Sequence, residues 1–169
     1  LSEVSPLPIV LYNIPGRTGV NISAETTLRL AEDCDNIVAV KEASGNITQI
    51  ADILQAKPQD FDVLSGDDAI TFEMLGLGAV GVISVIGNAY PALFSRMINC
   101  HNAGNESEAL AIHRSMNELY KLMSVDGNPA GVKSLLALQG KIDNVLRLPL
   151  VPASQSTQDA LKKVIAELG

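Results

Sequence analysis

The 169-residue sequence contains no tryptophan, and aromatic residues make up only 4% of it. We therefore expect a core built from aliphatic side chains. Cysteine is almost as scarce, because Cys34 and Cys100 are the only two. They are too few for a disulfide framework and match no metal-ligand spacing, which favours free thiols in a reducing compartment.

Basic residues are fewer than acidic ones, so the net charge is −7, and no run of basic residues is present. This argues against a nucleic-acid-binding protein and against attraction to anionic membranes. No apolar stretch reaches membrane-spanning length, and the residues from Leu1 onward do not read as a basic-then-apolar leader. We expect a cytoplasmic protein that attracts any anionic substrate through local charge. The first residue is leucine rather than methionine, which suggests a processed chain or a fragment.

Four short apolar runs, rich in β-branched residues, are mostly continuous rather than alternating. Continuity is typical of strands whose two faces are both covered, as in a parallel sheet flanked by helices. The runs lie at residues 9–11, 37–40, 61–64 and 80–85.

Helical segments with recognisable starts separate these runs. Ser23 and Asn46 are positioned to cap helices, and Asp67 with Asp68 begins a third that stops at Gly76. Beyond the fourth run the pattern is helical only. The expected accessory helices cover residues 91–101, 106–123, 128–140 and 156–169.

The strand–helix alternation predicts an α/β protein, and four units are half of what a closed (β/α)8 TIM barrel requires. We expect residues 1–87 to form the C-terminal half of such a barrel. Residues 88–169 would supply the last barrel helix and a C-terminal helical extension. The N-terminal half of the barrel is expected to be missing.

Lys41 ends the second apolar run and is followed at once by Ser/Gly/Asn turn chemistry. Such a position delivers the side chain to the mouth of an α/β sheet, where ligands bind. A desolvated lysine amine is a nucleophile for Schiff-base chemistry with a carbonyl. The alternative is a lysine that pairs with Glu42 at a strand end.

Tyr12 ends the first run and leads into a loop containing Arg17. The tyrosine hydroxyl could donate and accept protons during imine formation, or its ring could simply pack at the rim. The planar fork of Arg17 suits bidentate capture of a carboxylate, although a solvated loop arginine is the common case. Thr18 contributes a hydroxyl or only shapes the turn. An amine, a phenol and a guanidinium suit chemistry on a small oxo acid.

Other motifs are assigned no chemistry. Residues 76–81 match G-x-G-x-x-G, but a helix precedes them and a strand follows, the reverse of a dinucleotide site. Asp67 and Asp68 are expected to cap a helix rather than to bind a metal. His101 and His113 lie in helical segments away from the strand ends. We expect no cofactor and no metal.

Several motifs in order resemble one family. Residues 12–19 read YNIPGRTG, 40–45 VKEASG, 64–68 LSGDD, 81–85 GVISV, and 128–129 NP. Together they resemble the C-terminal part of the dihydrodipicolinate (4-hydroxy-tetrahydrodipicolinate) synthases, in the pyruvate-dependent class I aldolase (N-acetylneuraminate lyase) superfamily. The resemblance covers essentially the whole chain.

The resemblance implies a (β/α)8 barrel lyase in which Lys41 forms a Schiff base with pyruvate. It implies that Tyr12 relays protons, and that Arg17 binds the carboxylate of aspartate semialdehyde. Gly66 and Ile83 would line the pyruvate pocket through their backbones. The family needs no organic cofactor, is usually a homotetramer, and supplies diaminopimelate and lysine biosynthesis.

Two alternatives stay open. Sialic acid lyases and keto-deoxy-sugar acid aldolases share the tyrosine and the lysine, and a barrel remnant without catalysis is also conceivable. The joint presence of Lys41, Tyr12 and Arg17 argues against a remnant. The family's paired threonines, neighbouring-subunit tyrosine and lysine-feedback site have no counterpart in this sequence. We therefore expect the isolated chain to lack turnover, or to self-associate through its open sheet.

Overall fold

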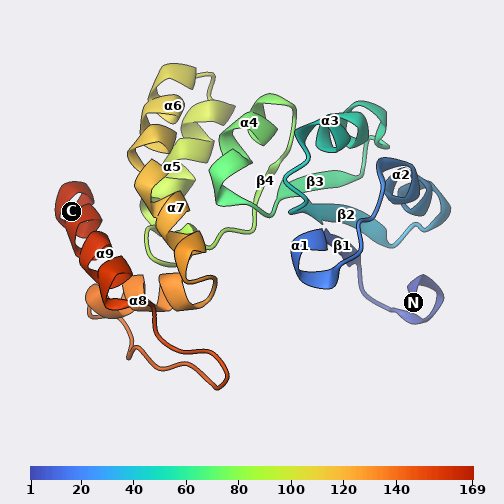
Figure 1. The fold of residues 1–169 in the computed structure, drawn as a ribbon. Helices are drawn as coiled ribbons and strands as arrows, with labels where there is room; N and C mark the ends of the chain where they lie inside the picture. Colours follow the sequence, from blue (N-terminus) through green and yellow to red (C-terminus); the bar gives the residue numbers. More distant parts are fainter. The chain divides into compact units, whose positions relative to one another are not determined.

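The chain forms two compact units, Leu1–Ser84 and Val85–Gly169, in a computed structural model that describes all residues from 1 to 169 (Figure 1). The first unit contains every strand and is α/β, as the alternating pattern predicts. The second unit is entirely helical. The candidate catalytic residues Tyr12 and Lys41 both belong to the first unit.

The sheet of the first unit is parallel, and its strands follow one another in sequence order. Its register places Tyr12 beside Lys41, and Lys41 beside Leu64. Because the strands are parallel, their carboxyl ends meet at one edge of the sheet. The strands are β1 (Ile9–Asn13), β2 (Ile37–Glu42), β3 (Asp62–Ser65) and β4 (Gly81–Val82).

Side-chain caps begin the helices of this unit where the sequence predicts them. Ser23 accepts a hydrogen bond from the Thr26 amide, and Asn46 accepts one from the Gln49 amide. These bonds satisfy amides that have no partner inside the helix. The helices are α1 (Pro15–Thr18), α2 (Ala24–Asp33), α3 (Ile47–Ala56) and α4 (Thr71–Gly76), with short 3₁₀ turns at η1 (Ser2–Val4) and η2 (Asp68–Ile70).

Helices α2 and α3 lie side by side over one face of the sheet (Figure 1). Ile50 and Ile53 of α3 are fully buried against Val40 of β2 and Val63 of β3, and Phe61 closes the cluster. Fully burying one such side chain contributes about 1.5–3 kcal/mol. This aliphatic core is the expected one, and it holds the strand ends in place.

The opposite face of the sheet is only partly covered. The central strand β2 is buried on both faces, since Ala39 and Val40 point in opposite directions and are 4% and 0% exposed. At the edge strand β1, in contrast, Val10 and Tyr12 are 47% and 46% exposed. The sheet therefore presents an open apolar side next to the candidate catalytic residues.

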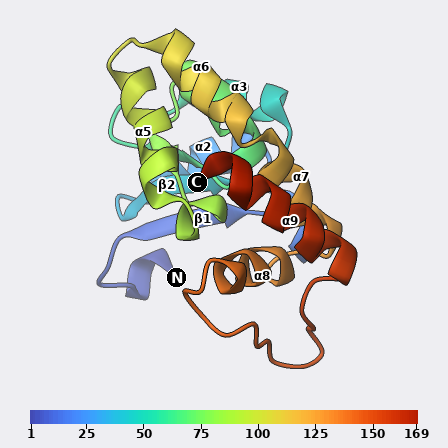
Figure 2. The same cartoon turned by 90° about the vertical axis from the view of Figure 1, so that its left-hand side faces the viewer.

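Helices α5 and α6 of the second unit run side by side, and α9 packs against α7 and α8 (Figure 2). The interior is aliphatic and methionine-rich, with Met97, Met116, Leu119 and Leu135 fully buried. The elements are η3 (Ile86–Asn88), α5 (Pro91–Asn102), α6 (Glu106–Ser115), α7 (Asn117–Val125), α8 (Ala130–Leu138) and α9 (Gln155–Leu168).

Residues 106–123 do not form the single helix that their periodicity predicts. The chain leaves helical geometry at Met116, where ψ is 0°, and the helix divides into α6 and α7. The Ser115 hydroxyl donates to the Ile112 carbonyl at 2.7 Å, a back-bond of the kind that bends helices. Met116 is fully buried at the break, so the apolar stripe continues through it.

The fourth strand is also shorter than predicted. Only Gly81 and Val82 pair with β3, although the apolar run continues to Val85. The ladder stops because β3 itself ends at Ser65, which leaves later residues without a full partner strand.

None of the helices combines the length and the apolar composition that crossing a membrane requires.

Candidate active site

Tyr12 and Lys41 lie side by side at the carboxyl edge of the sheet. They are register partners on β1 and β2, and the Lys41 Nζ atom is 4.0 Å from the centroid of the Tyr12 ring. A cation at this distance from an aromatic face is attracted by its quadrupole. Lys41 is partly buried, whereas Tyr12 is half exposed on the open side of the sheet. A primary amine and a phenol are thus held together on the less covered side of the sheet.

The alternative pairing of Lys41 with Glu42 is wrong. Successive side chains of a strand point to opposite faces, and Glu42 is fully buried beneath the sheet while Lys41 lies on the open side. The Glu42 carboxylate instead accepts a hydrogen bond of 2.6 Å from the Asn13 Nδ2 atom. None of the ion pairs in the structure involves Lys41.

Gly66, which follows β3, lies against the Lys41 side chain. A Cβ atom at this position would be 3.0 Å from Cε of Lys41, 3.0 Å from the Glu42 carbonyl oxygen and 2.8 Å from Cβ of Ala43. The Gly66 amide donates to the same Glu42 carbonyl at 2.7 Å. Hydrogen on the Cα atom is therefore all that fits beside the lysine.

Gly66→Ala is expected to lower the free energy of unfolding by about 1–3 kcal/mol, the usual cost of overpacking. The new methyl group must displace the Lys41 side chain or the backbone at Glu42. The change is measured as a shift of the urea midpoint of the full-length protein. Gly16→Ala is the matched control, because nothing lies within 4 Å of a Cβ atom there. Equal midpoints for the two variants would refute the close contact.

Arg17 lies on α1, the short helix that follows β1 at the same edge of the sheet, and its side chain is exposed. Pro15 begins this helix, and Gly19 ends it in the left-handed conformation with φ of 72°. The Thr18 hydroxyl donates to the carbonyl oxygens of Ile14 and Val20 at 3.2 and 2.9 Å. Of the two predicted roles for Thr18, these bonds favour shaping the turn that carries Arg17.

Ile83 follows β4 at the same edge. Its amide donates to the Ser65 carbonyl at 2.9 Å, which extends the ladder beyond the short strand, and its side chain is 48% exposed. The backbone amides of Gly66 and Ile83 thus both donate hydrogen bonds to backbone carbonyls of the neighbouring strand. Any backbone contact from these two residues to a ligand must come from their carbonyl groups.

The acidic pair at 67–68 and the glycine-rich stretch at 76–81 are structural features of the fold. Asp67 caps the turn η2, accepting from the Ala69 amide at 3.0 Å. Gly78, in the G-x-G-x-x-G stretch, adopts φ of 107° in the turn between α4 and β4. Glycine alone adopts this conformation at little cost, so the stretch is a helix-to-strand turn, as predicted.

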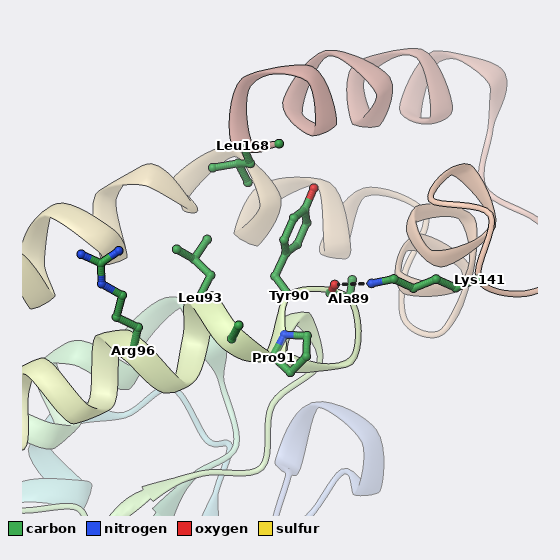
Figure 3. Close-up of a pocket in the computed structure, with 9 residues that line it drawn as sticks. Ala89, Tyr90, Pro91, Leu93, Arg96, Lys141 and Leu168 are labelled. Atoms are coloured by element: carbon green, nitrogen blue, oxygen red, sulfur yellow. Dashed lines mark hydrogen bonds between the residues drawn. The ribbon is translucent and has the colours of Figure 1, made fainter.

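The second unit contains a separate cavity of about 460 Å³ near the start of α5 (Figure 3). Arg96 and Lys141 line it, but both cations have protein partners. Lys141 donates to the Ala89 carbonyl at 2.8 Å, and Arg96 pairs with Glu108. The hydrogen bond from Arg96 lowers the pKa of the Glu108 carboxyl. Both cations that line this cavity are therefore engaged by groups of the protein itself.

Three residues that the sequence pattern does not mark as functional adjoin the candidate site. Asn13 follows Tyr12 and is fully buried, Glu42 follows Lys41 and is fully buried, and Gln49 lies in the first turn of helix α3. Hydrogen bonds join all three. Asn13 and Glu42 are each the second residue after an apolar run, directly beyond Tyr12 and Lys41, and that position was the available signal. No such position marks Gln49.

The profile of the Dihydrodipicolinate synthetase family matches residues 1–168. The chain is 58% identical, over 168 residues, to the 4-hydroxy-tetrahydrodipicolinate synthase of Phocaeicola vulgatus, and this alignment covers 99% of the chain and 57% of the relative. The chain thus spans a little over half the length of the curated relatives that it matches.

Solved structures agree with the sequence relatives. A dihydrodipicolinate synthase from Thermotoga maritima has a TM-score of 0.95 and 44% identity, covering 98% of this chain and 57% of that one. A dihydrodipicolinate synthase from Acinetobacter baumannii, described as chloride-inhibited and in complex with pyruvate, has a TM-score of 0.93 and 36% identity; the match covers 98% of this chain and 57% of that protein. The four parallel strands correspond to the C-terminal part of a TIM barrel, as the sequence predicts.

Proposed function

Because this chain belongs to the dihydrodipicolinate synthetase family, we propose that it supplies the imine-forming part of a 4-hydroxy-tetrahydrodipicolinate synthase. The proposed enzyme is a lyase that condenses pyruvate with L-aspartate 4-semialdehyde in lysine and diaminopimelate biosynthesis. The observation that carries the proposal is the contact between the Lys41 amine and the Tyr12 ring at the carboxyl edge of the sheet. The pyruvate complex of the related Acinetobacter baumannii enzyme supports the choice of pyruvate.

Lys41 is the proposed nucleophile. Its unprotonated Nζ atom adds to the keto carbon of pyruvate, and the resulting carbinolamine loses its oxygen as water to leave a carbon–nitrogen double bond. The imine withdraws electrons from the adjacent methyl group, which loses a proton and becomes the carbon nucleophile that attacks the aldehyde. The protein amine therefore supplies the electron sink, and the proposed reaction requires neither an organic cofactor nor a metal.

Tyr12 is the proposed proton carrier. Addition and dehydration each move a proton, and a hydroxyl close to the amine can donate in one step and accept in the other. The register of β1 and β2 holds the Tyr12 ring next to the lysine, which supports this role. Gly66 and Ile83 are proposed to border the pyruvate site, with Gly66 leaving room for the lysine side chain.

The proposed enzyme also needs partners. The open side of the sheet, where Val10, Tyr12 and Ile83 are about half exposed, suits the remaining strands of a closed barrel. We assign those strands to the part of the relatives' length that this chain does not span. Assembly into a homo-oligomer is proposed from the family resemblance.

Arg17 provides the test of the proposed substrate pair. If its guanidinium holds the carboxylate of L-aspartate 4-semialdehyde, Arg17→Ala in the full-length protein loses a charge-assisted hydrogen bond worth about 1.5–3 kcal/mol. We expect a rise of about 10- to 100-fold in the KM for the semialdehyde, with pyruvate imine formation nearly unchanged. Steady-state condensation kinetics and borohydride trapping measure the two effects separately.

Arg29→Ala is the matched control, because Arg29 is an exposed arginine of α2 that pairs only with Asp33. Equal damage to both substrates of the Arg17 variant would indicate a general structural role instead. Turnover of a sugar-acid aldehyde, with none of the semialdehyde, would overturn the proposed substrate pair.

A further inference from the structure

Glu42 is a fully buried carboxylate directly behind Lys41, and neutral groups alone satisfy it. Its Oε1 atom accepts hydrogen bonds from Asn13 Nδ2 at 2.6 Å and from Gln49 Nε2 at 3.4 Å. Its Oε2 atom accepts from the Ser44 amide and the Ser44 hydroxyl. No cation forms an ion pair with it. Burying a carboxylate costs free energy, and only these hydrogen bonds offset that cost. The arrangement therefore indicates a specific role for Glu42.

Asn13 connects this carboxylate to the loop that carries Arg17. It is fully buried, and its Oδ1 atom accepts from the Ile22 amide at 3.0 Å. Its Nδ2 atom donates to the Ile22 carbonyl and to Asn21 Oδ1 as well as to Glu42. The far end of the loop is thereby fastened to the end of β1.

Gln49 makes a second connection to the same loop. Its Nε2 atom donates to the Ile22 carbonyl at 3.1 Å, and its Oε1 atom accepts from Asn21 Nδ2 at 2.8 Å. Gln49 lies in the first turn of α3, the helix that follows β2. The network therefore links the ends of two strands, one helix start and the returning loop.

The position of this network relative to the reactive pair follows from strand alternation. Tyr12 and Lys41 lie together on the open side of the sheet, so Asn13 and Glu42, one residue further on, lie together on the other side. The bond between Asn13 and Glu42 thus joins the two backbones immediately beyond the reactive residues. We expect a change in that bond to shift the amine relative to the phenol.

We propose that Glu42 is a positioning residue, which holds the Lys41 amine against Tyr12 and, through Asn13, fixes the loop that presents Arg17. This inference rests on the proposed function for its kinetic consequences. The two acceptor oxygens of this side chain are essential, because four donors are directed at them. The amide of a glutamine would turn an N–H group toward either Asn13 Nδ2 or the Ser44 amide.

Glu42→Gln in the full-length protein is the principal test. We expect borohydride trapping of pyruvate to slow by about 10²-fold, the scale of a small misplacement of reacting groups, and the KM for the semialdehyde to rise. Ile53→Val is the matched control, since it destabilises the same core by about 0.5–1.5 kcal/mol without touching the network. A Glu42 variant that loses stability but traps pyruvate like this control would overturn the proposal.

A second variant separates the two branches of the network. Gln49→Ala removes one donor from Glu42 and one anchor of the loop, but it leaves the bond between Asn13 and Glu42 in place. We expect the KM for the semialdehyde to rise several-fold, with a smaller effect on pyruvate trapping. This variant also keeps the proposal testable if Glu42→Gln does not fold. An unchanged KM would overturn the role of the network in presenting Arg17.

Hydrogen–deuterium exchange distinguishes failure of this inference from failure of the proposed function. Glu42→Gln should speed exchange of the Ile22 amide, which is bonded to Asn13, whatever reaction the protein catalyses. Wild-type protein that does not trap pyruvate would refute the proposed function alone. Unchanged exchange at Ile22 in the Glu42 variant would refute the positioning network alone.

Discussion

Replacement of Lys41 by arginine is expected to abolish the borohydride-reducible adduct with pyruvate and the condensation activity of the full-length protein. A guanidinium stays protonated and cannot add to a carbonyl, so no imine forms. Arginine retains the positive charge and is slightly longer than lysine, so it can still reach the Tyr12 ring that the lysine amine contacts. The loss therefore reports on the nucleophile rather than on local charge.

Mass spectrometry of peptides from the reduced wild-type protein should place the adduct on Lys41. Lys57→Arg is the matched control, because Lys57 belongs to the same unit and its amine is near only the Pro58 carbonyl, at 3.5 Å. This control should be labelled as fully as the wild type. An adduct that persists in the Lys41 variant, on any other lysine, would contradict the assignment.

Tyr12→Phe has the second-largest expected effect. The variant keeps the aromatic ring 4.0 Å from the lysine amine and removes only the hydroxyl. Because proton transfer by a positioned group typically contributes about 10²–10⁴-fold, imine formation should slow by a factor in this range. Pyruvate binding should be little affected, so rapid-quench borohydride trapping at saturating pyruvate isolates the chemical step.

Tyr90→Phe is the corresponding control for loss of a phenolic hydroxyl. Tyr90 lies in the second unit, and its buried hydroxyl has no hydrogen-bond partner. Its removal should leave the rate of imine formation unchanged. If Tyr12→Phe behaved in the same way, Tyr12 would be a packing residue and the proton carrier would have to be sought elsewhere.

The sequence was sufficient for those features of the fold that depend on neighbouring residues. The caps at Ser23, Asn46 and Asp67 are local hydrogen bonds, and each forms where the pattern predicts it. The length of the fourth strand was overestimated, because it depends on where β3 ends. The apolar run from 80 to 85 contains no information on that point. The helix break at Met116 could not be predicted from periodicity, because Met116 is buried and continues the apolar stripe of the helix.

In the candidate site, too, local features could be predicted from the sequence and contacts between distant residues could not. The ends of the apolar runs identified Tyr12 and Lys41, and the register of two parallel strands explains why they meet. Adjacency in sequence left a pair of Lys41 with Glu42 open as an alternative, and strand alternation excludes it because the two side chains lie on opposite faces. The true partners of Glu42, Asn13 and Gln49, are distributed over another strand and a helix. Such a network is decided by tertiary packing, and single-sequence patterns do not record it.

The pairing of β1 with β2 also bears on how the reactive centre assembles as the chain folds. Asn13 and Glu42, which follow the reactive residues, are only 29 positions apart, and a single strand–helix–strand unit brings them together. Contacts of such short range form early, because closing a short loop costs little chain entropy. The amine and the phenol can therefore come together during synthesis before the helices beyond residue 85 exist.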